Sequence, residues 1–317
     1  MKSKTEQMAE IIWGMREAYF QGGNAMEWCR EYFRNSKINA EGNDLLATLV
    51  AYDLQAGSYV SAARSDREKN RRWCSQLADL LGGGVLAEGD SILELGVGEA
   101  TTLAGVLGQL GSKPGRAFGF DVSWSRVDVG RKWLRENRQE ASLFVADLLN
   151  IPMGDGSVDV VYSSHSLEPN RGKEEGAIRE CLRVARKAVV LIEPIYELAT
   201  REAQARIRSH GYVEGLRETA ERLGANVSDY RLLDYTPNAL NPSGVIHLTK
   251  VDASDGPKDE SSASVWRCPV TGVALEAGAE FFYAREVGLA YPILRGVPML
   301  RAENVIVASE LGRVVGQ

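Results

Sequence analysis

Three acidic side chains end short apolar runs, and a glycine-rich turn follows the first of them. Glu94 ends "SILE", Asp121 ends "FGFD" and Asp147 ends "FVAD". Gly96 and Gly98 come directly after Glu94, in "ELGVGEA". Carboxylates only accept hydrogen bonds, and glycine lets a backbone approach a ligand closely. The pattern therefore predicts a ligand that carries hydroxyl, amine or cationic groups.

The same turn argues against a dinucleotide. The dinucleotide fingerprint G-x-G-x-x-G/A fails because its last position is Thr101, and Glu99 would repel a pyrophosphate held at a helix N-terminus. The acids suit a cationic nucleoside instead: Asp121 for the ribose hydroxyls, Asp147 for the adenine amine, and Glu94 for an ammonium or sulfonium group. S-adenosylmethionine has these features. Taken alone, each acid also fits a solvated turn or a helix N-cap.

The elements that would position these acids alternate along the chain. From residue 91, short apolar runs alternate with amphipathic stretches, which predicts an α/β layer fold with a mainly parallel sheet. Such sheets bind ligands at the carboxyl ends of their strands. We predict a helical N-terminal cap over 1–85, an α/β domain over 86–251, a polar linker over 252–264 and a small β-rich module over 265–317.

Four segments in this order resemble the class I S-adenosylmethionine-dependent methyltransferases: "ELGVGEA" (94–100), "FGFDVS" (118–123), "FVADLLNIPMGDGSVDVVYSSHSLE" (144–168) and "ECLRVARKAVVLIEP" (180–194). The resemblance covers roughly residues 90–250 and implies a Rossmann-like, seven-stranded sheet. The family's third glycine is Ala100 here. The cofactor contacts predicted with it are Glu94, Gly96, Val97, Gly98, Asp121, Val122, Asp147, Leu148, Ser163 and Ser164.

Upstream, "AYDLQAGSYV" (51–60) resembles a helix that many family members place over the cofactor. That resemblance makes Tyr52, Gln55 and Tyr59 candidate lid contacts. Tyr52 and Tyr59 are seven residues apart, which is also the spacing of a helical core face.

Methyl transfer needs a base only if the acceptor starts protonated. The candidates follow the fourth and fifth strands: His165, Glu168, Glu193 and Tyr196. His165 is the first choice because imidazole titrates near neutral pH. It equally fits a polar turn residue that closes the pocket. No histidine and carboxylate spacing indicates a metal site.

The last fifty residues have their own pattern. "AEFFYAR" and "GLAYPI" are β-prone segments bounded by turns, and 301–310 predicts a short helix. "CP" and "VGLAYPILRGVPML" resemble the small activator-subunit family of tRNA and protein methyltransferases, over about 266–310. Members often bind zinc through a CxxC pair, but Thr271 replaces the second cysteine, so we expect no zinc. The resemblance implies docking on the sheet in cis; an independent domain on a tether is the alternative.

Composition narrows the function. A net charge of −6 does not favour nucleic acid or an anionic membrane. Scattered cysteines and the absence of a signal peptide or a long apolar run predict a cytoplasmic protein with reduced thiols. The favoured function is a methyltransferase acting on a small molecule, such as a sugar or secondary metabolite. The alternatives are a tRNA or protein methyltransferase with a fused activator, and a non-catalytic S-adenosylmethionine-binding scaffold.

Overall fold

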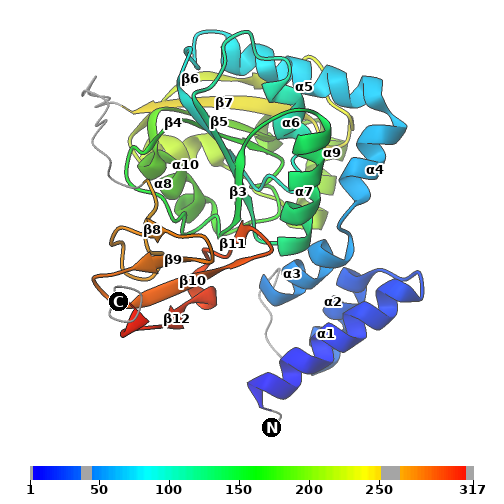
Figure 1. Cartoon of the computed structure of the whole chain (residues 1–317). Helices are drawn as coiled ribbons and strands as arrows, with labels where there is room; N and C mark the ends of the chain where they lie inside the picture. Colours follow the sequence, from blue (N-terminus) through cyan, green and yellow to red (C-terminus); the bar gives the residue numbers. More distant parts are fainter. Residues whose placement is uncertain (1–2, 37–44, 251–264, 312–317) are drawn as a thin grey trace.

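The centre of the protein is a seven-stranded mixed sheet, seen in a computed structural model that describes residues 3–36, 45–250 and 265–311 (Figure 1). The strand order is β3-β2-β1-β4-β5-β7-β6, with β1 to β5 parallel and β7 antiparallel to both neighbours. The expected α/β fold is confirmed. The strands are β1 (Ser91–Leu95), β2 (Arg116–Asp121), β3 (Ser142–Val145), β4 (Val158–Ser164), β5 (Ala185–Pro194), β6 (Ala225–Leu232) and β7 (Ser243–Lys250).

Helices cover both faces of the sheet because its central strands are apolar on both sides. Along β1, Ile92 packs into one buried cluster, and Leu93 and Leu95 pack into the other, as the two-residue period of a strand requires. The first cluster contains α5 (Arg67–Gly82), α6 (Thr101–Leu107) and α7 (Trp124–Glu136). The second contains α8 (Glu174–Val184) and α10 (Leu216–Arg222). Between β5 and α10 lie η1 (Tyr196–Leu198) and α9 (Arg201–His210).

The turn after β1 has a backbone that favours glycine. Gly96 and Gly98 have φ angles of 57° and 52°, in the left-handed region. A Cβ atom on Gly96 would lie 2.4 Å from that of Ser166, so no larger residue fits there. Ala100 also has a positive φ, 54°, and is fully buried against Gly130. The small methyl group of Ala100 is thus accommodated where the resembling family has its third glycine.

The N-terminal helices form two groups. The first three, α1 (Lys4–Phe20), α2 (Ala25–Ser36) and α3 (Leu45–Leu54), bury a small cluster of their own around Met15 and Cys29. By contrast, α4 (Ser58–Ser65) and α5 pack against α6 of the main domain. Figure 1 shows α1 and α2 at one end of the molecule, whereas α4 and α5 lie alongside the central domain.

The C-terminal module lies against the β3 edge of the sheet (Figure 1). Val145 of β3 forms a parallel bridge with Met299, and the Leu300 amide donates to the Val145 carbonyl at 2.8 Å. The Trp266 ring packs edge-on against Phe118 and Phe144. The elements of this module are β8 (Glu276–Ala277), β9 (Phe281–Ala284), β10 (Leu289–Leu294), β11 (Val297–Pro298), η2 (Ala302–Asn304) and β12 (Ile306–Val307).

These contacts agree with docking in cis and give no support to a free tether. The predicted linker, 252–264, lies outside the described residues, as does the end of the predicted module, 312–317. The helix predicted over 301–310 is wrong: only one 3-10 turn forms, and 306–307 pair with β10 as β12. No helix in the described part of the chain is long and apolar enough to cross a membrane.

Candidate functional site

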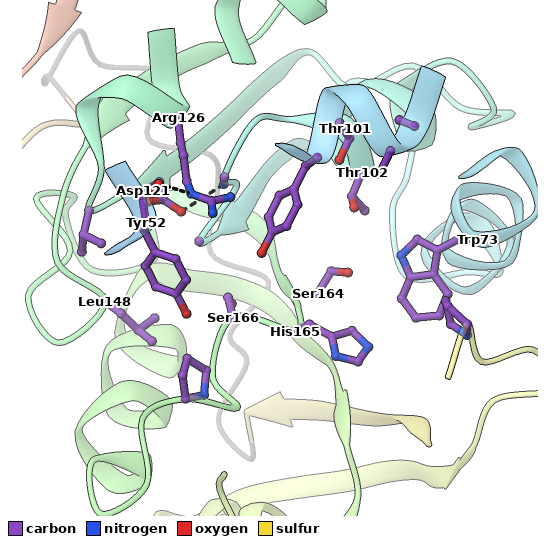
Figure 2. Close-up of a pocket in the computed structure, with 18 of the residues that line it drawn as sticks. Tyr52, Trp73, Thr101, Thr102, Asp121, Arg126, Leu148, Ser164, His165 and Ser166 are labelled. Atoms are coloured by element: carbon purple, nitrogen blue, oxygen red, sulfur yellow. Dashed lines mark hydrogen bonds between the residues drawn. The ribbon is translucent and has the colours of Figure 1, made fainter. Parts of the chain in front are cut away.

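A cavity of about 910 Å³ opens above the carboxyl ends of β1, β2 and β4, roofed by α3, α4 and α5. This volume lies within the range of small-molecule sites. Figure 2 shows two ends. Asp121, Tyr52 and Leu148 lie at one end, and Trp73 and His165 lie at the other, with Ser164 between them. We call these the Asp121 end and the Trp73 end.

Asp121 lies at its end of the cavity with acceptor capacity to spare. One carboxylate oxygen accepts from the Gly98 amide at 3.1 Å, and the other accepts from the Ser123 amide at 2.9 Å. Burial raises the pKa of Asp121, although these amides and the Arg126 charge act against that shift. Because a carboxylate has about four lone-pair positions, two remain for a ligand with paired hydroxyls.

Asp147 and Leu148 line the same end, as predicted. The Leu149 amide donates to the Asp147 carboxylate at 2.9 Å, which holds the β3 turn in place. Leu148 is buried and offers an apolar surface beside this carboxylate. An apolar wall with an acceptor at its edge suits a flat heterocycle that carries an amine.

Glu99 does not face the cavity. It is fully buried, and its two oxygens accept from the amides of Gly57, at 2.9 Å, and Val60, at 2.7 Å. These amides belong to the N-terminus of α4, where a negative charge is favourable. The acid in the glycine turn thus attaches α4 to the turn.

Arg126 completes this attachment. Its side chain is 2% exposed and lies 3.6 Å from Glu99, and its Nε donates to the Tyr52 carbonyl at 2.9 Å. The guanidinium carbon lies 5.0 Å from the Tyr52 ring centre and 4.3 Å from that of Tyr59. No sequence pattern indicates a role for Arg126, because that role depends on contacts with residues of α3 and α4 that are far away in the chain.

Both predicted lid tyrosines line the cavity, but the third lid candidate does not. The Tyr59 ring would lie 3.5 Å from a Cβ atom on Gly98, so it covers the glycine turn. Burial raises the pKa of Tyr52 well above its ordinary range, so its hydroxyl stays protonated. Gln55 is exposed and does not line the cavity.

Glu94 lies beneath the cavity and does not line it. It pairs across the sheet with Tyr162 of β4, whose hydroxyl donates to it at 2.7 Å. Burial raises the pKa of Glu94 to about 8. A protonated Glu94 is neutral at pH 7, so direct attraction of a cation is not its role in this arrangement.

The turn after β4 is built around another buried acid. Glu193 accepts from three successive amides, those of Ser166, Leu167 and Glu168, at 3.0 to 3.1 Å. Burial raises the pKa of Glu193 to about 7. The three bonds fix the turn and place Ser166 and His165 on the cavity wall. Glu193 thus acts on the site through the backbone and is not itself exposed to a ligand.

His165 lines the cavity, yet both of its ring nitrogens are engaged. Nδ1 lies 2.7 Å from the Glu168 carboxylate, and Nε2 lies 2.7 Å from the Ser243 hydroxyl. Burial alone would lower the pKa of His165, but the bond and charge of Glu168 raise it overall. The order serine, histidine, acid is that of a nucleophilic triad. Ser243 is only 1% exposed and does not line the cavity, so a substrate cannot reach it.

This geometry favours the second interpretation of His165, a turn residue that closes the pocket. Its φ of +57° is rare for a non-glycine residue and is held by these bonds. Glu168 is also bonded to Asn241, at 3.1 Å, and lies behind the histidine rather than on the cavity wall. Tyr196 lies outside the cavity, beneath the Arg208 guanidinium.

The cavity therefore brings together part of the predicted set. Predicted residues on its wall are Tyr52, Tyr59, Gly96, Gly98, Asp121, Val122, Asp147, Leu148, Ser164 and His165. Those that do not line it are Gln55, Glu94, Val97, Ser163, Glu168 and Tyr196. Val97 is buried against Gly119, and Ser163 is fully buried within the sheet.

The sequence patterns did not predict that one face of α5 lines the cavity. Asp66, the N-cap of α5, and Lys69, Asn70 and Trp73 within it all line the cavity, at the spacing of one helix face. The periodic pattern predicts the helix but not which face turns toward the sheet. The described residues contain no cluster of three or more histidine, cysteine or acidic side chains placed to hold a metal ion.

Comparison with known proteins gives one family match. Residues 92–188, under a third of the chain, match the methyltransferase domain family. The matched range contains the glycine turn, Asp121, Asp147 and the end of β4. No curated protein matches.

Several solved structures are similar at low identity. One chain in the complex between the Haloferax volcanii Trm112 methyltransferase activator and a protein taken to be a methyltransferase is 19% identical, with a TM-score of 0.46, covering 60% of this chain and 94% of that chain. The geranyl diphosphate C-methyltransferase from Streptomyces coelicolor A3(2) is 16% identical, with a TM-score of 0.45, covering 56% and 79%. A SAM-dependent methyltransferase from Aquifex aeolicus is 17% identical, with a TM-score of 0.41, covering 56% and 89%.

Proposed function

We propose that this protein is an S-adenosylmethionine-dependent methyltransferase that acts on a small molecule. The family match supports methyltransferase activity for residues 92–188. The observation that carries the cofactor assignment is Asp121, whose carboxylate lines the cavity beside a glycine turn and retains free acceptor positions. The cavity volume, about 910 Å³, favours a small acceptor.

The residues present fit this cofactor. Asp121 would accept from both ribose hydroxyls, and Asp147 and Leu148 would hold the adenine at its amine and its face. Gly96 and Gly98 leave room for the ligand beside the turn, and the Ser166 hydroxyl is buried with no hydrogen-bond partner in the described part of the chain. Such a group favours a polar ligand, because an unpaired buried hydroxyl costs about 1–3 kcal/mol.

The chain's own contribution to the chemistry is positioning. When bound, S-adenosylmethionine supplies a methyl group on a positively charged sulfur. The Asp121 end would fix the nucleoside, and the lid tyrosines would exclude water. The β4 turn would direct the methyl group toward the Trp73 end. Orientation of this kind can supply several kcal/mol of the barrier reduction.

Calorimetry with S-adenosylhomocysteine tests the assignment. Asp121→Ala removes the acceptor for two hydroxyls, and we expect binding to weaken by at least about a hundredfold, since hydrogen bonds to charged groups contribute about 1.5–3 kcal/mol each. Asp128→Ala in α7, outside the cavity, where that carboxylate pairs with Lys132, is the matched control. Equal affinity of the wild-type protein and Asp121→Ala would contradict the assignment.

The alternatives remain distinguishable. The module docked at β3 has the sequence resemblance to activator subunits of tRNA and protein methyltransferases, and this favours a macromolecular substrate as the second candidate. Methylation of bulk tRNA or of peptides by the purified protein, with labelled S-adenosylmethionine, would support that candidate. Binding without turnover of any acceptor in a metabolite extract would favour the scaffold.

A further inference from the structure

The Trp73 end of the cavity has a composition that indicates an acceptor class. Trp73 and His165 line it together, with ring centres 5.7 Å apart and planes tilted by 54°. This separation is typical of aromatic pairs, and a third ring can join such a pair with the same geometry. Figure 2 shows the indole nitrogen of Trp73 on the side that faces the cavity. The wall therefore suits a flat ring.

Cationic charge accompanies these rings. Lys69 lies one helical turn before Trp73 on the same face of α5. Lys173 also lines the cavity, but it lies at the start of α8, where Gly176 packs against Leu149 of the β3 turn. Neither ammonium group forms an ion pair with another described residue. Arg126, the third lining cation, is already paired with Glu99.

Each lining acid accepts at least one hydrogen bond from the backbone. Asp66 caps α5 by accepting from the Lys69 amide at 3.0 Å, and Asp121 and Asp147 each accept amides at their own strand ends. These acids keep their negative charge, but Lys69 is a lining cation at the Trp73 end whose ammonium group forms no ion pair with another described residue, so it can meet an anionic acceptor there.

His165 has no free ring nitrogen that could take a proton from an acceptor. His165 uses one nitrogen for Glu168 and the other for Ser243, both at 2.7 Å. An acceptor that arrives already ionised needs no base.

We propose that the acceptor is a small aromatic oxyanion, a ring bearing an ionised carboxylate or phenolate, with its ring against Trp73 and its charge beside Lys69. This inference rests on the proposed function and names the substrate class for the same cavity. The acceptor oxygen forms a bond to the methyl carbon as the carbon–sulfur bond breaks, and that electron pair stays on sulfur. An anion and a cation become a neutral ester or ether and a neutral thioether, so no proton moves.

Ligand-observed NMR on the full-length protein saturated with S-adenosylhomocysteine tests this inference. The probes are benzoate and its neutral counterpart benzamide. We expect benzoate to bind more tightly than benzamide. Lys69→Met should weaken benzoate binding about three- to fivefold, the effect of one exposed charge pair, and leave benzamide unchanged. Trp73→Leu, which keeps an apolar side chain, should weaken both about two- to tenfold.

Lys113 lies outside the cavity, so Lys113→Met is the matched control and should change the affinity for neither ligand. If S-adenosylhomocysteine binds but benzamide competes as well as benzoate, or Lys69→Met has no effect on benzoate, the acceptor class is wrong and the proposed function stands. If S-adenosylhomocysteine itself fails to bind, the proposed function and this inference both fail. Preferential binding of an aromatic amine such as aniline would also overturn the assignment of an oxyanion as the acceptor.

Discussion

Replacing Glu99 should release the lid while leaving the sheet folded. The Glu99 carboxylate is fully buried, accepts two α4 amides at 2.9 and 2.7 Å, and lies 3.6 Å from Arg126. Glu99→Ala leaves both amides and the buried guanidinium without this partner. Removing one member of a buried pair typically costs about 3–5 kcal/mol. At about 1.4 kcal/mol per tenfold change, α4 should open roughly a hundredfold to several thousandfold more often.

Hydrogen exchange read by mass spectrometry measures this opening directly. Peptides covering 55–65 should lose protection by that factor in Glu99→Ala, and Glu99→Gln should show a smaller loss because its amide oxygen can still accept one bond. Peptides from β4 and β5 should keep their protection. The matched control is Glu136→Gln, which removes a half-exposed partner of Arg64 and should cost at most about 1 kcal/mol.

Unchanged protection of 55–65 in Glu99→Ala would refute the attachment of the lid through the glycine turn. Loss of protection throughout the chain would show instead that Glu99 supports the whole domain. We expect neither result, because Glu99 is the buried charged partner of α4, whereas the other α4 contacts are the half-exposed Arg64–Glu136 pair, Tyr59 against Arg126, and buried apolar side chains such as Val60 and Ala63. Cofactor affinity should fall along with the protection.

Three further predictions concern the buried acid beneath the cavity, the cavity histidine and the docked module. Because burial raises the pKa of Glu94 to about 8, the folded state holds a proton that the unfolded state releases near pH 4.5. The free energy of unfolding should therefore fall by up to roughly 1.4 kcal/mol per pH unit between pH 4.5 and 8. In urea titrations, Glu94→Gln should flatten that slope. Glu168→Gln should lower the pKa of His165, measured by NMR, since the Glu168 carboxylate raises it; an unchanged value would contradict the pairing. Trp266→Ala should destabilise the chain by about 3 kcal/mol in urea, the lower end for such truncations, because Trp266 is partly buried; a module that does not support the sheet predicts under about 1 kcal/mol.

The sequence was most informative where chemistry follows from local pattern. Asp121 ends β2 and Asp147 lies two residues past β3, and these neighbouring strands are parallel. Parallel strands bring their carboxyl ends to the same edge, so the presence of both acids in one cavity could be predicted. Gly96 and Gly98 could be predicted because a left-handed backbone favours glycine. These inferences need only the strand and its immediate continuation.

The sequence was least informative where a role depends on a partner far away in the chain. Glu94 turns away from the cavity because Tyr162 pairs with it across β1 and β4, a register that no local pattern fixes. His165 is occupied by Ser243, which is 78 residues away. Trp73 lines the cavity because of how α5 packs on the domain. The periodic pattern of a helix predicts an apolar face but not which element covers that face.

A crystal structure with S-adenosylmethionine bound tests the central claim most directly. The account predicts the ribose hydroxyls on the Asp121 carboxylate, the adenine beside Leu148, and the methyl group directed toward Trp73. A nucleoside bound elsewhere, or one whose methyl group points away from the Trp73 end, would contradict it.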